Sequence, residues 1–153
     1  MILALIWALV AGPLAQDAAT ETPTSARSGD LTLSQGAMMA WSVNGGLGGQ
    51  VTVLVDNAGA GTDRILSMTT PSGTVGDVGV YPVVNGRGER APDGDLTIRP
   101  GRTGVLAKLT DLASGVPAPV LTTVTITFEQ AGEVAVQAMP ASPAPPAPPT
   151  PRR

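Results

Sequence analysis

The stretch VTVLVDNAGAGTDRILSM, from Val51 to Met68, decides the fold. It opens with a β-branched run, Val51 to Val55, which is typical of a strand covered on both faces. The Asp56-Asn57 pair and the Gly59-Ala60-Gly61 segment then favour a loop. A second strand starts at Arg64. A strand as apolar as the first is expected in the middle of a sheet, because an exposed apolar edge invites aggregation.

The composition restricts both the size of the domain and its chemistry. The 153 residues suit one domain with tails. Aromatic residues make up only 3% of the chain, so the core must be built from Val, Leu, Ile and Ala. There is no His and no Cys, which excludes disulfides, the usual zinc sites, and thiol or imidazole catalysis. The net charge of -3 is too weak and too mixed to favour nucleic acid or an anionic membrane as a partner.

The N-terminal residues predict export. Residues 1–15 read MILALIWALVAGPLA, an apolar run too short to span a bilayer, although no Lys or Arg precedes it. The competing interpretation is an N-terminal strand or helix of the domain. We expect residues 1–19 to be a signal peptide cleaved between Ala15 and Ala19, and residues 20–30 to be a disordered linker. The expected location is therefore periplasmic or secreted, with no membrane contact beyond the signal segment.

From Leu31 onward, short apolar runs alternate with turn signals. Asn44 to Gly49 (NGGLGG) is expected to be a flexible loop, and Thr74 to Val84 is either two short strands or one bulged strand. Asn85-Gly86 is the strongest short hairpin signal in the chain. Further strands are expected at Leu31–Leu33, Ala37–Val43, Leu96–Arg99 and Val105–Leu109.

Val120 to Ala138 predicts a closing hairpin. Val124, Ile126 and Phe128 alternate with threonines, as in a half-buried strand. Residues 139–153 are Pro- and Ala-rich and are expected to be a disordered tail. Residues 31–138 are therefore predicted to form an all-β sandwich or barrel of about seven to nine short strands.

Several motifs resemble the periplasmic copper chaperone family PCu(A)C. They are Ala40-Trp41, the run Val51–Gly73 with its Asn-x-Gly loop, the segment Leu96–Thr103, and TITFEQAGEVAV at Thr125–Val136. The resemblance covers roughly residues 31–138. It implies a small, exported, cupredoxin-like β-domain that carries Cu(I) to respiratory oxidase assembly.

The copper ligands that the resemblance implies are absent. The family binds Cu(I) with a His, a Met in the following hairpin and a later His-x-Met pair, because imidazole and thioether suit this soft ion. The first His would fall near Val78, and the pair near Leu106 and Lys108. We therefore assign no catalytic, cofactor-binding or metal-binding residue. No cofactor is expected, although copper(I) stays open through the resemblance.

Methionine is the soft ligand type that survives in the chain. Met38 and Met39 are adjacent, so on a strand they point to opposite faces. Met68 is interpreted as a core residue, because Met usually fills gaps in cores. Met139 stands at the edge of the predicted domain. The four thioethers are therefore not expected to form one copper site.

A mixed-charge cluster surrounds the loop that the family uses for copper. Its members are Arg87, Glu89, Arg90, Asp93, Asp95, Arg99 and Arg102. One interpretation is a solvated rim whose charges pair with one another, which surface energetics favour. The other is a docking face for a protein partner.

Three functions are compatible with these features. The first is a PCu(A)C-like domain without the His/Met copper site, which acts through protein contact in the cell envelope. The second is a Cu(I) carrier for oxidase assembly that uses the remaining methionines. The third is an enzyme on a β-sandwich, which the lack of any recognised catalytic motif disfavours. The missing ligands favour the first function, and we expect no enzymatic activity.

Overall fold

The computed structural model describes residues 24–43, 46–112 and 121–141, and all regular structure in these ranges is β. The strands are β1 (Ser25–Ser28), β2 (Leu31–Val43), β3 (Gly46–Asn57), β4 (Asp63–Thr69), β5 (Thr74–Val84), β6 (Arg87–Gly88), β7 (Thr97–Ile98), β8 (Gly101–Thr110), β9 (Thr122–Phe128) and β10 (Gly132–Pro140). The all-β prediction is confirmed. The strand number exceeds the expected seven to nine through the short strands β1, β6 and β7. The described residues contain no helix long and apolar enough to cross a membrane.

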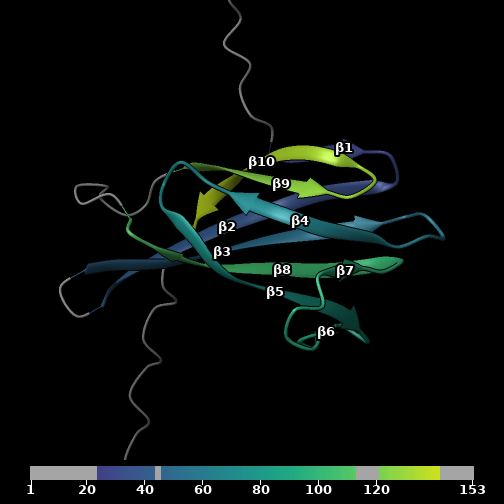
Figure 1. The fold of residues 1–153 in the computed structure, drawn as a ribbon, viewed down its shortest axis with the longest axis horizontal. Coiled ribbons are helices and arrows are strands. Elements are labelled where there is room, and N and C mark those ends of the chain that lie inside the picture. The colour runs from purple at the N-terminus through teal and green to yellow at the C-terminus, as the bar shows by residue number, and fades with distance from the viewer. Residues whose placement is uncertain (1–23, 44–45, 113–120, 142–153) are drawn as a thin grey trace, which may run out of the picture.

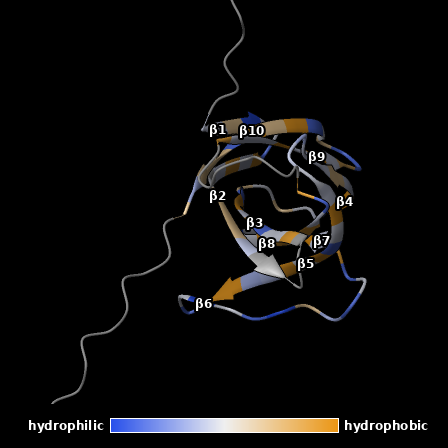
Figure 2. Cartoon of the chain, turned by 90° about the vertical axis from the view of Figure 1, so that its left-hand side faces the viewer, coloured by the Kyte–Doolittle hydropathy of each residue, from blue (hydrophilic) through white to orange (hydrophobic). Residues whose placement is uncertain are grey.

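The strands form one strongly curved sheet. Their order is β6-β5-β8-β3-β2-β10-β9-β4-β7, with β1 paired to β2 beside this path. The pairing of β10 with β2 is parallel, whereas the other strand pairs are antiparallel. Figures 1 and 2 show that the sheet rolls up, so that β5 approaches β4 and β7 across the core. The fold is thus an open sheet with the shape of a barrel.

The segment between β6 and β7 spans the opening of this roll. At one end, the Ala91 N–H donates to the Val80 carbonyl of β5 at 2.8 Å. At the other end, the Ile65 N–H of β4 donates to the Leu96 carbonyl at 3.0 Å. The segment is thereby hydrogen-bonded to both ends of the curved sheet, and it carries much of the mixed-charge cluster.

The organising strand β3 lies between β8 and β2, which confirms its predicted interior position. Val51, Val53 and Val55 are fully buried, whereas Thr52 and Leu54 are half-buried. The expectation that both faces are covered is therefore wrong. A rolled sheet encloses only its inner face, and within the described ranges no second layer packs over the outer face of β3.

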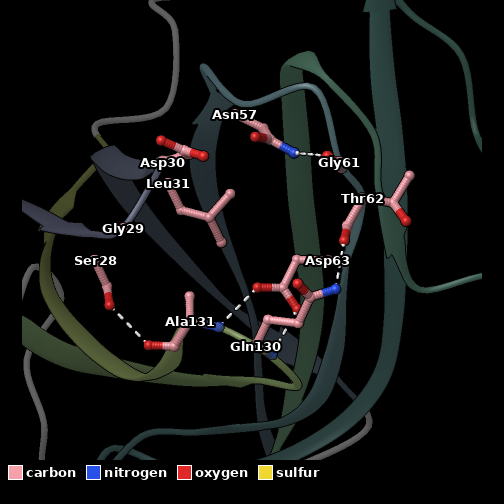
Figure 3. Close-up of a pocket in the computed structure, with 10 residues that line it drawn as sticks. All are labelled: Ser28, Gly29, Asp30, Leu31, Asn57, Gly61, Thr62, Asp63, Gln130 and Ala131. Atoms are coloured by element: carbon pink, nitrogen blue, oxygen red, sulfur yellow. Dashed lines mark hydrogen bonds between the residues drawn. The ribbon is translucent and has the colours of Figure 1, made fainter.

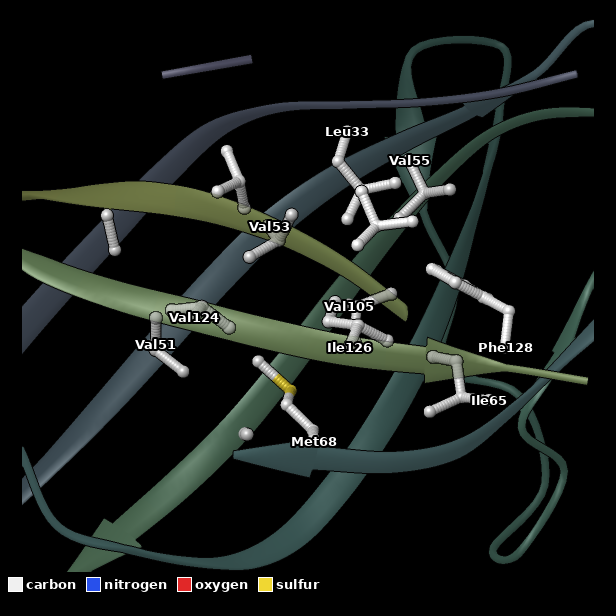
Figure 4. Close-up of a cluster of buried hydrophobic side chains, with 14 of the residues drawn as sticks. Leu33, Val51, Val53, Val55, Ile65, Met68, Val105, Val124, Ile126 and Phe128 are labelled. Atoms are coloured by element: carbon white, nitrogen blue, oxygen red, sulfur yellow. The ribbon is translucent and has the colours of Figure 1, made fainter. Parts of the chain in front are cut away.

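The core fills the inside of the roll, as Figure 4 shows. Phe128 and Ile126 of β9, Ile65 of β4 and Val105 of β8 all point into it. Met68 lies among them, as the sequence predicted. The aliphatic side chains dominate because the chain offers almost no aromatic residue to fill the same volume.

The hairpins predicted at Asn85-Gly86 and at Val120–Ala138 are present, whereas the two strands of the Val51–Met68 stretch do not form the hairpin that their succession suggests: β3 lies between β8 and β2, and β4 between β9 and β7. β9 and β10 pair with Val134 opposite Ile126 and Val136 opposite Val124, so the apolar sets of both strands share the inner face. The turn between β5 and β6 has positive φ at Asn85 (52°) and Gly86, as a type I′ hairpin turn requires. β5 itself is one bulged strand.

Several boundaries differ from the prediction, and β8 begins at Gly101 instead of Val105. β2 is one strand with an irregularity between Ser34 and Ala37, and Gly46–Gly49 belong to β3 instead of a loop. Ser25–Ser28 of the predicted linker form β1, and Met139–Pro140 of the predicted tail belong to β10. Backbone pairing with β2 recruits three segments that have no strand pattern of their own, namely Ser25–Ser28, Gly46–Gly49 and Met139–Pro140. The predicted signal peptide (residues 1–19), residues 20–23 of the predicted linker and residues 142–153 of the predicted tail lie outside the described residues.

Candidate functional site

The family resemblance puts the copper ligands near Val78, Leu106 and Lys108. These residues lie on the adjacent strands β5 and β8. Leu106 and Lys108 alternate with the buried Val105, Ala107 and Leu109, so both face outward. Val78 is opposite Ala107 and packs against the core. The structure therefore does not bring Val78 to the face of Lys108. Its neighbour Asp77 takes the outward position instead.

Asp77 is the centre of an exposed ion-pair network. Its carboxylate lies 3.3 Å from Arg90 Nη2 and 3.7 Å from Lys108 Nζ. Arg90 Nη2 also lies 3.1 Å from the Asp93 carboxylate. All four side chains are exposed, so the pairs contribute little to stability. Their consequence is a change in the ligand chemistry of this surface: the cationic groups of Arg90 and Lys108 lie at the position near which the resemblance puts copper ligands.

Two further arginines of the mixed-charge cluster also pair with acids. Arg102 contacts Asp56 through Nε (2.8 Å) and Nη2 (3.3 Å), and this hydrogen-bonded partner raises the pKa of the guanidinium. Arg99 Nη2 lies 3.0 Å from the Asp95 carboxylate. Hydrogen bonds from Thr97 and then from Arg99 hold the pKa of Asp95 below its ordinary value.

These contacts support a rim whose charges pair with one another. Arg90, Arg99 and Arg102 each have a carboxylate partner. Asp56 and Asp77 were missed by sequence reasoning, because they precede the cluster and meet it only through the register of β8 with its neighbours. Arg87 and Glu89 are exposed beside the hairpin turn.

A second candidate is a small pocket where three turns meet, shown in Figure 3. It has a volume of about 210 Å³, below the roughly 300–1,000 Å³ of a typical ligand pocket. Its buried carboxylate, Asp63, accepts hydrogen bonds from the N–H groups of Gln130 and Ala131, both at 2.9 Å. Asn57 donates to the Gly61 carbonyl. The polar groups therefore hold the turns together instead of facing a ligand.

The described residues hold no cluster of three or more His, Cys, Asp or Glu side chains that suits a metal ion. Met38 and Met68 are buried, whereas Met39 and Met139 are exposed. The predicted divergence of Met38 and Met39 is confirmed.

Comparison with known proteins gives structural matches only. No protein-family model matches the chain, and no curated protein does. The apo PCuAC domain from PmoF1 is similar with a TM-score of 0.58 and 17% identity, covering 78% of this chain and 99% of that domain. The apo PCuAC domain of PmoF2 gives 0.56 and 20%, covering 79% and 97%.

A copper-bound PCuAC domain from PmoF2 is also similar, with a TM-score of 0.51 and 22% identity, over 78% of this chain and 98% of that domain. Identities this low establish the fold and leave function open. The resemblance that the sequence motifs predicted is therefore confirmed at the level of structure: the chain has the fold of PCuAC domains.

Proposed function

We propose that this protein is an exported PCuAC-like domain that has lost the copper site of the family and acts through contact with another protein in the cell envelope. The observation that carries the proposal is the ion-pair network of Asp77, Arg90 and Lys108 on the outer surface of β5 and β8. The fold is retained, while the chemistry at this position has changed.

The residues present do not fit Cu(I). This ion prefers thioether, thiolate or imidazole ligands, whereas Asp77 offers a hard carboxylate that is already paired. Lys108 adds an ammonium group, whose charge repels a metal cation. Leu106 offers no donor atom. A domain with this surface is expected to leave copper unbound at this position.

Protein contact is supported by the exposed hairpin beside the network. Val84, at the end of β5, is 57% exposed. It is opposite Arg87, and Glu89 follows at the surface. We infer that this mixed-charge hairpin, with Val84 at its exposed end, is the contact face, since the rims of transient protein interfaces are polar. We accordingly propose no enzymatic activity.

The loss of the copper site is tested by NMR with added Cu(I) under anaerobic conditions. The backbone amide signals of Asp77, Leu106 and Lys108 should not shift in the natural protein. The variant Asp77→His/Leu106→His/Lys108→Met places imidazole and thioether on three outward positions, so its signals there should shift. Shifts in the natural protein at these positions would refute the proposal.

The contact is tested by placing a photo-crosslinking amino acid at Val84 in cells that make the protein. Leu66, an exposed apolar residue on β4, is the matched control position. A discrete adduct is expected from position 84 and none from position 66. Equal labelling, or none at position 84, would remove this hairpin as the contact face.

Mass spectrometry of the same envelope fraction should show a mature protein that begins between Gln16 and Thr20.

The second candidate function, a Cu(I) carrier that uses surviving methionines, is favoured by one observation. Met39 and Met139 are both exposed, and they come from neighbouring strands. A copper site made of these two methionines would lie on β2 and β10. It would therefore be independent of the position on β5 and β8 at which the family's ligands are missing.

A further inference from the structure

Three large side chains on β2 and β10 are exposed although their chemistry favours burial. Met39 is 42% exposed, Trp41 41% and Met139 52%. Methionine normally fills gaps inside cores, and the other two described methionines, Met38 and Met68, do so. Two exposed thioethers and an indole in one part of the surface therefore suggest a use beyond packing.

The strand register places these side chains on the same face. Met139 is the direct partner of Ala37 in the parallel pairing of β10 with β2. Met38 and Ala138 point into the core, so Ala37, Met39 and Met139 point outward by alternation. Met39 follows Ala37 by two residues and is thus the diagonal neighbour of Met139, with Cα atoms about 7–8 Å apart.

The surface around the pair leaves room for an ion. Ala37, directly opposite Met139, has a small side chain. Trp41 is the next outward residue after Met39 on β2, and its partner on β3 is Gly48, which has no side chain. Each Met side chain has three rotatable bonds, so both sulfurs can turn toward one point above Ala37.

We propose that Met39 and Met139, with Trp41 beside them, bind a soft monovalent cation, Cu(I) or Ag(I). Thioether sulfur selects such ions over hard cations. The indole ring attracts a cation within about 6 Å of its centre. The site belongs to the second candidate function and rests on it. Because only two sulfur atoms hold the ion, it is expected to bind and dissociate readily. Such a site suits a protein that receives the ion and passes it on.

The charge distribution supports selectivity for a soft ion. The sequence from Leu31 to Val55 contains no charged residue, so β2 and most of β3 offer no carboxylate to Mg²⁺ or Ca²⁺. On the same face, Met39 is opposite Gln50, which is opposite Lys108. The backbone of Lys108 is thus two strands, or about 10 Å, from that of Met39, and its ammonium group pairs with Asp77 of β5, on the side of β8 away from the methionines.

The test is an anaerobic titration of the full-length protein with Cu(I) against a chromogenic chelator, repeated with Ag(I). A Trp7→Phe background leaves Trp41 as the fluorescent reporter. We expect uptake of one ion with quenching of Trp41. Met39→Leu and Met139→Leu should each weaken binding at least about tenfold, since even changes outside the ligand shell have effects of that size. Lys108→Gln should leave the affinity within about twofold, because this exposed charge is distant from the methionines and already pairs with Asp77.

Met38→Leu and Met68→Leu are the matched controls, because they remove buried thioethers of the same chain. Both should bind like the natural protein, and thermal unfolding of all variants would verify that they fold. Absence of uptake would overturn the site and the carrier function, while the protein-contact proposal would stand. Uptake that survives both Met39→Leu and Met139→Leu would overturn this site alone and place the ion elsewhere.

Discussion

Asp63→Ala is the substitution that tests most directly how the turns of this domain are held. The side chain is 7% exposed, at the start of β4. Its carboxylate accepts hydrogen bonds from the backbone N–H groups of Arg64 (2.7 Å), Gln130 (2.9 Å) and Ala131 (2.9 Å). Two of these donors belong to the turn between β9 and β10, so one side chain connects the β3–β4 loop to the closing hairpin.

The magnitude follows from the number of bonds lost. Hydrogen bonds to a charged group contribute about 1.5–3 kcal/mol each. The three N–H groups are only partly buried, and water will replace some of the lost interaction. We therefore expect Asp63→Ala to lower the free energy of unfolding by about 3–4 kcal/mol, which corresponds to a melting temperature lower by roughly 10–15 °C. Asp63→Asn keeps one acceptor oxygen and should lose about 1–2 kcal/mol.

Urea unfolding followed by circular dichroism provides the measurement. Asp93→Ala is the matched control, because this carboxylate is 90% exposed and pairs only with Arg90 among the described contacts. It should stay within about 0.5 kcal/mol of the natural protein. Equal stability losses for Asp63→Ala and Asp93→Ala, or a loss below about 1 kcal/mol for Asp63→Ala, would refute the structural role given to Asp63.

Three further predictions concern the core, a strand crossing and one carboxylate. Phe128→Ala should lower the free energy of unfolding by about 3–5 kcal/mol in urea, because its ring is fully buried; a loss below 1 kcal/mol would show that the core collapses around the gap. Gly36→Ala should cost about 1–3 kcal/mol, because its Cβ would lie 2.6 Å from the Gln137 carbonyl; unchanged unfolding would show that β10 shifts freely. The pKa of Asp95 is lowered on folding, so this carboxylate stabilises the fold above its unfolded pKa of about 4, and the stabilisation is lost as the pH falls through the folded pKa. Asp95→Asn should remove this part of the acid dependence of stability. Identical profiles of stability against pH for the variant and the natural protein would contradict the prediction.

Much of the fold is readable from local patterns in the chain. The alternation of Val124, Ile126 and Phe128 predicted β9 and its inner face, because a strand whose side chains alternate has only one way to bury them. Asn85-Gly86 predicted its turn for an equally local reason, since few residues tolerate positive φ. The apolar run of β3 predicted an interior strand, and only the covering of its outer face was wrong.

Segments whose side chains show no strand pattern could be assigned as strands only from the structure. Ser25–Ser28 are polar and small, and they form β1 because their backbone pairs with the start of β2. Gly46–Gly49 become part of β3 in the same way, opposite the end of β2. Backbone hydrogen bonds stabilise a strand whatever its side chains are, so these elements leave no periodic signal in the sequence.

The sequence by itself determined the all-β class, the two hairpins, the resemblance to PCuAC domains and the absence of the His ligands, since each depends on residue type and short spacing. Only the tertiary structure decided which side chains meet across strands. It paired Asp77 with Lys108 at the position near which the family has copper ligands, and it brought Met39 and Met139 to one outward face. The physical reason is that strand register and the parallel pairing of β10 with β2 are set by the whole rolled sheet, and no local pattern encodes them.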